Sequence, residues 1–173
     1  NFHCQGRRLS EKSGDTFIMS NSSENSYQVD QLKVRRFDAL AEMAAAAADD
    51  AAHVLREAIA QRGSARAIIA TGNSQDQFLE NLTQKTDIDG SKVALFHMDE
   101  YLGMPMTHTA SFRKYLKERV FDVGKPAEAH FLEGDAMEPL KAIRAYTDAL
   151  ESAPVDLCCL GIGENGHIAF NDP

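Results

Sequence analysis

The residues that most clearly suggest catalysis are the last thirteen of the chain, positions 161–173. They run Gly-Ile-Gly-Glu-Asn-Gly-His-Ile-Ala-Phe-Asn-Asp-Pro and follow an apolar stretch at 155–160 that predicts a buried strand. His167 is followed five residues later by Asp172. A carboxylate that orients an imidazole suits it to transfer protons near neutral pH. The alternative is a structural histidine that simply follows a strand.

A second candidate is the acidic pair Asp99-Glu100, which follows a predicted strand at 93–96. A carboxylate in this position could act as a general base on a carbon next to a carbonyl group. Met98 and Tyr101 flank the pair and favour partial burial, which would raise the pKa of a carboxylate toward a useful range. The alternative is a solvated acidic turn.

A third candidate is the loop Thr71-Gly72-Asn73-Ser74, which follows a predicted strand. Ser74 and Gln77 form an S-x-x-Q capping box that predicts the start of a helix. A glycine allows the backbone to approach an anion, and a helix N-terminus offers N–H donors. The loop is therefore a candidate phosphate site, with a plain strand-to-helix turn as the alternative.

Gly161, Gly163 and Gly166 also match the G-x-G-x-x-G pattern of dinucleotide-binding proteins. That pattern should open a helix, whereas Pro173 follows shortly behind an Asn-Asp pair. We therefore expect no nicotinamide cofactor, and an NAD-dependent oxidoreductase is the least favoured function.

The remaining histidines and the cysteines carry weaker signals. His97, His108 and His130 are predicted to be structural or surface residues. Cys158 and Cys159 are neighbours on a predicted strand and would point to opposite faces, so we do not expect them to pair. No metal-binding spacing such as C-x-x-C occurs, and we predict no metal site. A reducing, cytoplasmic setting fits these cysteines.

The elements that must position these residues alternate between strand and helix. Strands are predicted at 65–70, 93–96 and 155–160, and helices at 36–62, from 74 onward, at 111–120 and at 140–150, with Gly63 as the stop of the first helix. This alternation predicts a parallel sheet covered on both faces. Ligands bind such sheets beyond the carboxyl ends of the strands, so the three candidate loops should converge.

Length and composition limit the possible functions. A chain of 173 residues with 43% hydrophobic residues is one globular domain or most of one. A net charge of −8 argues against nucleic acid as a partner. No apolar run approaches the ~20 residues of a membrane-spanning helix, so we expect no membrane partner.

The two ends of the chain have unusual sequences. We expect residues 1–18 to be upstream sequence or a tag, Met19 to begin the natural chain, and Pro173 to be a point of truncation. Residues 1–30 are predicted to be a disordered or non-native extension. Residues 31–173 are then the amino-terminal part of a single domain.

Taken together, three motifs resemble glucosamine-6-phosphate deaminases (isomerases). They are Thr-Gly-Asn-Ser at 71–74, Met-Asp-Glu-Tyr-Leu-Gly at 98–103 and the terminal motif at 161–173, and the resemblance covers about 38–173. It implies a Rossmann-like three-layer α/β sandwich with a mostly parallel sheet, as in ribose-5-phosphate isomerases and CoA transferases. It also implies conversion of glucosamine 6-phosphate and water to fructose 6-phosphate and ammonia in amino-sugar catabolism.

The resemblance assigns roles residue by residue. Asp99 matches the base that shuttles a proton between C2 and C1, and His167 matches the residue that opens the pyranose ring. Asn165 and Asp172 match the residues that assist His167. The matches for substrate and phosphate binding are Thr71, Gly72, Asn73, Ser74, Glu100 and Gly166. The resemblance implies no organic cofactor, a phosphosugar as partner, and a chain that could form a homo-oligomer.

Some positions depart from the usual family pattern. Asn165 stands where many members have Asp, and Asp172 stands where Glu is usual. An amide can hold an imidazole by a hydrogen bond but cannot share its positive charge. Two alternatives therefore stay open: a 6-phosphogluconolactonase-like hydrolase, and a sugar-phosphate sensor without catalysis.

Overall fold

The computed structural model describes residues 25–169 and 171, and the chain divides between Asp38 and Ala39 into two compact units. The described part of the first unit is a hairpin, in which β1 (Asn25–Val29) pairs antiparallel with β2 (Leu32–Arg36). Asp30 has a φ of 51° in the turn, a left-handed conformation that Asp tolerates better than most residues. The boundary expected at residue 30 thus falls inside this hairpin, whereas Met19 and residues 1–18 lie outside the described residues.

The second unit begins with the helix α1 (Leu40–Arg62). It starts four residues later than the predicted position 36, because 32–36 is already committed to β2. Gly63 ends the helix as predicted, with a φ of 82° and its N–H donating to the carbonyl of Ile59 at 2.8 Å. The buried face is made almost entirely of small side chains: Ala44, Ala48, Ala51, Ala52, Leu55 and Ala58.

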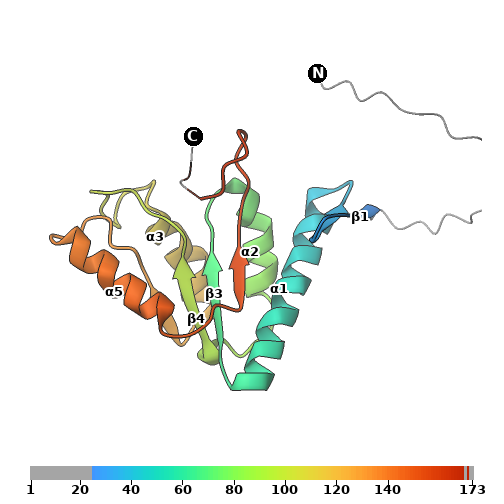
Figure 1. Cartoon of the computed structure of the whole chain (residues 1–173), viewed down its shortest axis with the longest axis horizontal. Helices are drawn as coiled ribbons and strands as arrows, with labels where there is room; N and C mark the ends of the chain where they lie inside the picture. Colours follow the sequence, from blue (N-terminus) through green and yellow to red (C-terminus); the bar gives the residue numbers. More distant parts are fainter. Residues whose placement is uncertain (1–24, 170, 172–173) are drawn as a thin grey trace, which may run out of the picture. The chain divides into compact units, whose positions relative to one another are not determined.

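Four parallel strands form the sheet of the second unit, in the order β5-β4-β3-β6 (Figure 1). Their bounds are β3 (Ala65–Ile69), β4 (Val93–His97), β5 (Glu128–His130) and β6 (Leu157–Cys159). The parallel sheet predicted from the alternation of elements is confirmed. The strand β5 was not predicted, because three residues with the sequence Glu-Ala-His carry no apolar pattern.

The two faces of the sheet are covered by different helices. Alternate apolar residues of β3 and β4, such as Ile69 and Leu95, belong to the core shared with α1 and with α2 (Asp76–Thr83). On the other face, Tyr146 of α5 (Pro139–Glu151) meets the ring of Phe96 edge-on, with the centroids 5.8 Å apart. Arg66 also donates from β3 to the carbonyl of Ala149 in α5 at 2.7 Å. The result is the three-layer α/β sandwich that the sequence predicted.

The strand β6 is less buried than predicted. It was expected to be a buried strand over 155–160, but within the described residues it pairs with β3 alone and lies at an edge of the sheet. Cys158 is exposed and Leu160 is 45% exposed as a consequence. Cys158 and Cys159 are both free thiols, as predicted.

The helix after the first loop begins differently from the predicted capping box. A 3₁₀ turn, η1 (Asn73–Gln75), precedes α2, and no side chain caps the helix. Ser74 instead accepts a hydrogen bond from the side chain of Gln75 at 3.3 Å. The capping-box prediction is wrong because the 3₁₀ turn, closed by the Gln75 N–H on the carbonyl of Gly72, already occupies those positions.

The predicted helix at 111–120 is present with a change of winding. The helix α3 (Phe112–Leu116) is capped by the Ser111 hydroxyl and continues as a π-helical turn, η3 (Lys117–Phe121). A short turn α4 (Asp122–Gly124) follows, and a 3₁₀ turn η2 (Gly90–Lys92) precedes β4. Among the described helices, none combines the length and apolar character needed to cross a bilayer.

Candidate active site

A cavity of about 190 Å³ lies beyond the carboxyl ends of β3, β4 and β6, where residues of three loops line it. The strands β3 and β4 run side by side in Figure 1. We call the three loops the Thr71 loop (71–76), the Asp99 loop (98–104) and the His167 loop (161–169). Ile69, His97 and Cys159 lie in register at the ends of their strands, which brings the loops to one level. The lining residues are Ala70, Thr71, Ser74, Met98, Asp99, Phe112, Gly161, Ile162, Gly163, His167 and Ala169. The predicted convergence of the three loops is confirmed.

Asp99 comes from the end of the central strand β4. The N–H of Met98 donates to the carbonyl of Ile69 at 3.3 Å, which extends the contact between β3 and β4 one step beyond the strand. Asp99 follows directly, half-buried and on the wall of the cavity. A carboxylate held at the end of a paired strand is well placed for a general base.

His167 lies on the same cavity and is held by Asn165. The side-chain oxygen of Asn165 accepts from the backbone N–H of His167 at 3.1 Å and faces the ring Nδ1 at 2.5 Å. A backbone N–H can only donate, so the amide atom that faces it must be oxygen, and Nδ1 must carry the proton. A neutral imidazole in this tautomer carries its lone pair on Nε2, which can accept a proton.

Glycines shape the backbone around His167. Ile162 and Ile168 form an antiparallel bridge, and the N–H of Gly163 donates to the carbonyl of His167 at 2.9 Å. A Cβ on Gly163 would overlap the imidazole ring, so only glycine allows this approach. Gly166 turns the chain with a φ of 87°. The described residues of this loop open no helix, so the glycines lack the helix start of a dinucleotide site.

The Thr71 loop offers polar donors to the cavity. The side chains of Thr71 and Ser74 line it, and Gly72 adopts a φ of 115° and a ψ of 164°, a conformation open chiefly to glycine. Asn73 begins the 3₁₀ turn beside them. None of the described residues on the cavity wall is a lysine or arginine. Hydroxyl and backbone N–H groups are therefore the donors that an anion would meet here.

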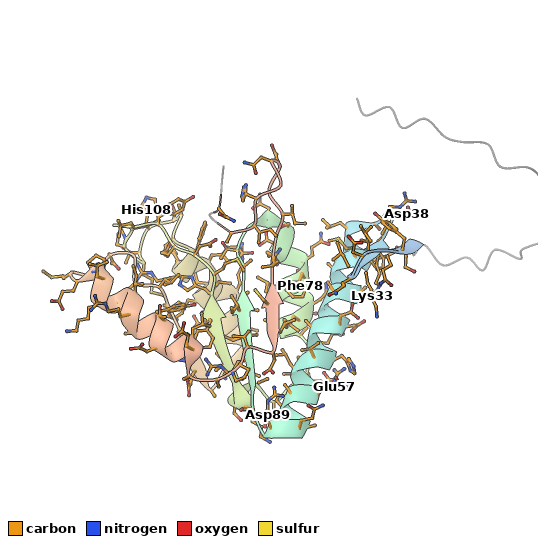
Figure 2. All side chains as sticks on the ribbon, viewed as in Figure 1. Lys33, Asp38, Glu57, Phe78, Asp89 and His108 are labelled. Atoms are coloured by element: carbon orange, nitrogen blue, oxygen red, sulfur yellow. The ribbon has the colours of Figure 1, made fainter. Side chains whose placement is uncertain are left out.

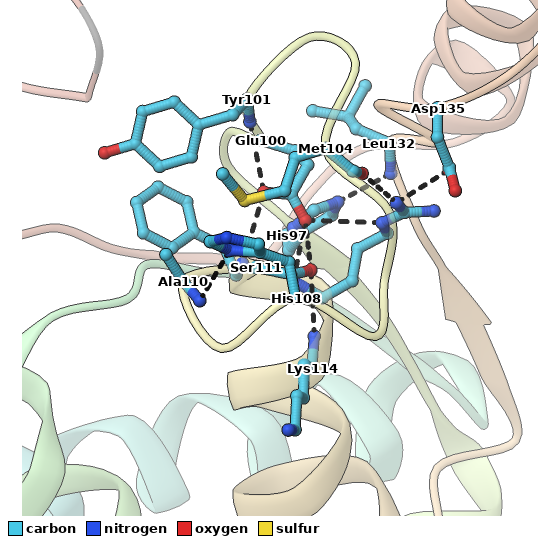
Figure 3. A network of polar contacts seen from close by, with 12 residues as sticks. His97, Glu100, Tyr101, Met104, His108, Ala110, Ser111, Lys114, Leu132 and Asp135 are labelled. Atoms are coloured by element: carbon cyan, nitrogen blue, oxygen red, sulfur yellow. Dashed lines mark hydrogen bonds and ion pairs between the residues drawn. The ribbon is translucent and has the colours of Figure 1, made fainter.

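Glu100 is placed differently from its neighbour Asp99, since it is absent from the cavity wall and its side chain is only 1% exposed. It lies at the centre of a network of polar contacts (Figure 3). One carboxylate oxygen accepts from the Ser111 hydroxyl at 2.7 Å and from the N–H of Arg113 at 3.0 Å. The other accepts from the N–H of Tyr101 at 3.0 Å and of Phe112 at 3.2 Å. Burial alone would raise the pKa of Glu100, but these hydrogen bonds together hold it below its usual value.

The other histidines lie where the sequence analysis placed them, as structural or surface residues. His97 is buried, and its Nε2 accepts from the N–H of Leu132 at 2.6 Å. Burial lowers the pKa of His97 to about 4, so its ring is neutral at physiological pH. His108 lies in an exposed turn (Figure 2), and His130 is half-buried against Phe96.

Thr71, Ser74, Asp99 and His167 are thus brought together on one cavity, and Asn165 reaches it through His167. Gly72, Asn73 and Gly166 shape the flanking loops, Glu100 faces α3, and Asp172 lies outside the described residues. No group of three His, Cys, Asp or Glu side chains in the described part of the chain is arranged to hold a metal ion.

Sequence reasoning missed two residues that shape this site, Gly163 and Arg113. Arg113 is 5% exposed, although a basic residue on a predicted helix suggests a surface position. A signal was present, because Arg113 lies three and seven residues before Leu116 and Val120, on the inward face of a helix. For Gly163, no pattern revealed that the ring of His167 would take the place of a side chain.

Comparison with known proteins places this geometry in a family. Residues 38–170 match the family model of glucosamine-6-phosphate isomerases/6-phosphogluconolactonase. The chain is 38% identical over 128 residues to glucosamine-6-phosphate deaminase 2 of Giardia intestinalis, covering 70% of this chain and 49% of that protein. It is 36% identical over 124 residues to glucosamine-6-phosphate deaminase of Streptococcus sanguinis, covering 71% of this chain and 52% of that protein.

Solved structures show the same fold. A monomeric glucosamine-6-phosphate deaminase superposes with a TM-score of 0.69 at 25% identity, covering 78% of this chain and 57% of that one. A 6-phosphogluconolactonase from Shewanella baltica superposes with a TM-score of 0.68 at 24% identity, covering 76% and 57%. The chain spans about half the length of these relatives. By its match over residues 38–170, the chain belongs to the glucosamine-6-phosphate isomerase/6-phosphogluconolactonase family.

Proposed function

We propose that this chain carries the acid–base centre of an amino-sugar phosphate isomerase/deaminase, which converts glucosamine 6-phosphate and water to fructose 6-phosphate and ammonia. The observation that carries the proposal is that Asp99 and His167 line one cavity together with Thr71 and Ser74. The curated relatives from Giardia intestinalis and Streptococcus sanguinis are named for this activity and support it.

The proposed chemistry begins at His167. With its lone pair on Nε2, the imidazole takes the proton of the anomeric hydroxyl and returns a proton to the ring oxygen, so the pyranose opens to an aldehyde. Asn165 keeps the ring in the tautomer that this step needs. Asp172 is proposed to assist from its position in the terminal motif.

Asp99 then acts on the carbon chain. Its carboxylate removes the proton from C2, which is acidic because C1 is a carbonyl carbon, while the oxygen on C1 gains a proton to give an enolamine. The carboxylate then delivers its proton to C1 as the nitrogen at C2 loses a proton. The nitrogen at C2 is left as an imine, water adds to C2, and ammonia leaves to give the ketose. The steps consist of proton transfers and hydration, so the proposal includes no organic cofactor.

The Thr71 loop is proposed to bind the phosphate group. Thr71 and Ser74 supply hydroxyl donors, while Gly72 and Asn73 let the backbone approach an anion. Gly166 is proposed to give the backbone of the His167 loop the same freedom beside the sugar. A cytoplasmic location, which suits free thiols at Cys158 and Cys159, and assembly as a homo-oligomer are further parts of the proposal.

A lactone hydrolase is the second candidate, favoured by one observation. An imidazole with a lone pair on Nε2 could activate water without help from Asp99. The 6-phosphogluconolactonases among the solved relatives share the fold. The two candidates differ in whether the Asp99 carboxylate is required.

The test compares ammonia release from glucosamine 6-phosphate with hydrolysis of 6-phosphogluconolactone by the full-length protein that contains this chain. We expect ammonia release that disappears in Asp99→Asn, with negligible lactone hydrolysis. Lactone hydrolysis that survives Asp99→Asn would favour the hydrolase instead. Thermal stabilisation by glucosamine 6-phosphate without any turnover would favour a sensor.

A further inference from the structure

The Asp99 loop has little regular structure to fix its shape. It begins the segment 98–111, which joins β4 to α3 without helix or strand, and its tip residues Tyr101 and Leu102 are 43% and 80% exposed. Two backbone contacts brace it: Gly103 donates to the carbonyl of Gly134 at 2.6 Å, and Met104 donates to that of Tyr101 at 3.2 Å. Apolar packing at the tip is limited: the Tyr101 ring contacts the Phe112 ring with the centroids 5.2 Å apart, while Leu102 is exposed.

Buried charged side chains provide further contacts that hold the Asp99 loop. The Arg113 side chain is 6% exposed, and its Nε lies 3.3 Å from the Glu100 carboxylate. Its Nη2 donates to the carbonyl of Met104 at 2.7 Å and to the carboxylate of Asp135 at 2.8 Å (Figure 3). One guanidinium thus binds the beginning and the end of the Asp99 loop and joins them to a third segment. The fixed fork of an arginine can make these bonds simultaneously, which a lysine cannot.

The same helix reaches the Thr71 loop two residues later. The Tyr115 hydroxyl lies 2.5 Å from the carboxylate of Asp76 and 3.3 Å from the carbonyl of Gly72. The guanidinium of Arg119 stacks over the Tyr115 ring at 4.4 Å and pairs with Asp76 at 3.2 Å. Burial and the hydrogen bond to Asp76 raise the pKa of the Tyr115 hydroxyl above its usual value.

We infer that α3 is a brace that sets the spacing between the general base and the phosphate loop, with Arg113 and Tyr115 as its positioning residues. Arg113 acts through Glu100 on the Asp99 loop, and Tyr115 acts on the Thr71 loop. Neither side chain lines the cavity, so both act on the reaction through other residues. The expected changes in kcat and KM rest on the proposed function, whereas the restraint of the two loops by α3 does not.

The test is the division between kcat and KM in the full-length protein. Arg113→Met frees the Asp99 loop, so we expect kcat for ammonia release to fall between about 10-fold and 100-fold, with KM changed less than about threefold. Tyr115→Phe keeps the ring under Arg119 but loses the hydroxyl, so we expect KM to rise about fivefold with kcat nearly unchanged. Arg56→Met is the matched control, because Arg56 pairs with Asp87 on a surface away from the cavity.

A second measurement separates failure of the brace from failure of the proposed function. In Arg113→Met, hydrogen exchange at the amides of Tyr101 and Met104 should accelerate more than exchange in β3, whether or not the protein releases ammonia. If Arg113→Met does not fold, Arg113→Lys keeps the charge without the fork and should show the same pattern at smaller amplitude. Unchanged exchange in the loop, or lower thermal stability with wild-type kcat and KM, would overturn the inference.

Discussion

The Asp99 loop and the His167 loop face the same cavity but are held in different ways. The Asp99 loop is fixed by buried charge, with Glu100 and Arg113 almost wholly removed from solvent. The His167 loop is fixed by its own backbone, through the bridge between Ile162 and Ile168 and an exposed amide at Asn165. A loop of the first kind depends on residues from other segments, whereas one of the second kind depends on its own sequence. Substitutions in the Asp99 loop should therefore lower both stability and activity. Substitutions in the His167 loop should lower activity alone.

Replacing the base should have the largest effect. In Asp99→Asn an amide cannot accept the proton from C2, so turnover should fall by a factor between about 10² and 10⁴. Binding should persist, because the donors of the Thr71 loop are unchanged. Calorimetric titration with glucosamine 6-phosphate, alongside the ammonia assay, measures both. Substantial turnover in the variant would remove Asp99 from its proposed role.

The glycine beneath the imidazole provides the corresponding test on the His167 side. In Gly163→Ala the new methyl group would overlap the ring, so His167 must move. We expect kcat to fall between about 10-fold and 100-fold. The free energy of unfolding should change by less than about 1 kcal/mol, because the loop is largely exposed.

Gly124→Ala serves as the control for that variant, since a Cβ there meets no atom within 4 Å. A large loss of stability in Gly163→Ala would show that the His167 loop also contributes to the stability of the fold, and the proposed difference between the two loops would be wrong.

The Asp99 side should also respond to acid through His97. Burial lowers the pKa of His97 from 6.5 to about 4. Between these two pH values, the imidazole is protonated in the unfolded chain and neutral in the folded protein. This contribution to stability is complete above pH 6.5 and is lost as the pH falls toward 4. Between pH 7 and pH 5 the loss is about 2 kcal/mol.

Urea unfolding of His97→Gln at those two pH values tests this. Glutamine still offers an acceptor to the N–H of Leu132 but does not titrate, so the pH dependence of the unfolding free energy should shrink by about the same 2 kcal/mol. An identical pH dependence in both proteins would mean that other groups dominate.

The smallest effect is expected at Asn165. Asn165→Ala removes the acceptor that orients His167, worth about 1 kcal/mol for a solvent-accessible hydrogen bond, or about fivefold in kcat. The loss should be larger for the cyclic substrate than for an analogue fixed in the open-chain form, because ring opening needs the oriented imidazole. Asn165→Asp retains an acceptor and should lose less. Equal losses on both substrates would contradict a ring-opening role for His167.

The contrast between the loops also explains what the sequence could predict. The alternation of strands and helices predicted the parallel sheet and the meeting of the three loops, because both follow from local pattern and from the geometry of parallel strands. Asn165 lies two residues from His167, so their contact could be anticipated from the chain itself.

The brace around Glu100 could not be anticipated in the same way. Glu100 and Arg113 are thirteen residues apart, and their contact depends on how α3 packs against the loop. The resemblance matched Glu100 to substrate binding, and no role was expected for Arg113 because a charged residue on a helix suggests a solvent-exposed position. The strand β5 and the 3₁₀ turn at Asn73–Gln75 were missed for a related reason, since pairing with neighbouring segments decides short elements more than their own composition does.

The alanine face of α1 has a consequence for how freely this protein can change. Ala48 and Ala52 are 0% exposed and let the helix lie close to its neighbours. This alanine-rich stretch is therefore fully buried at these positions, and each added methylene there would cost about 1–3 kcal/mol. In a library of random substitutions, we expect this tract to tolerate fewer replacements than the charged outer face of the same helix, where Glu57 lies (Figure 2).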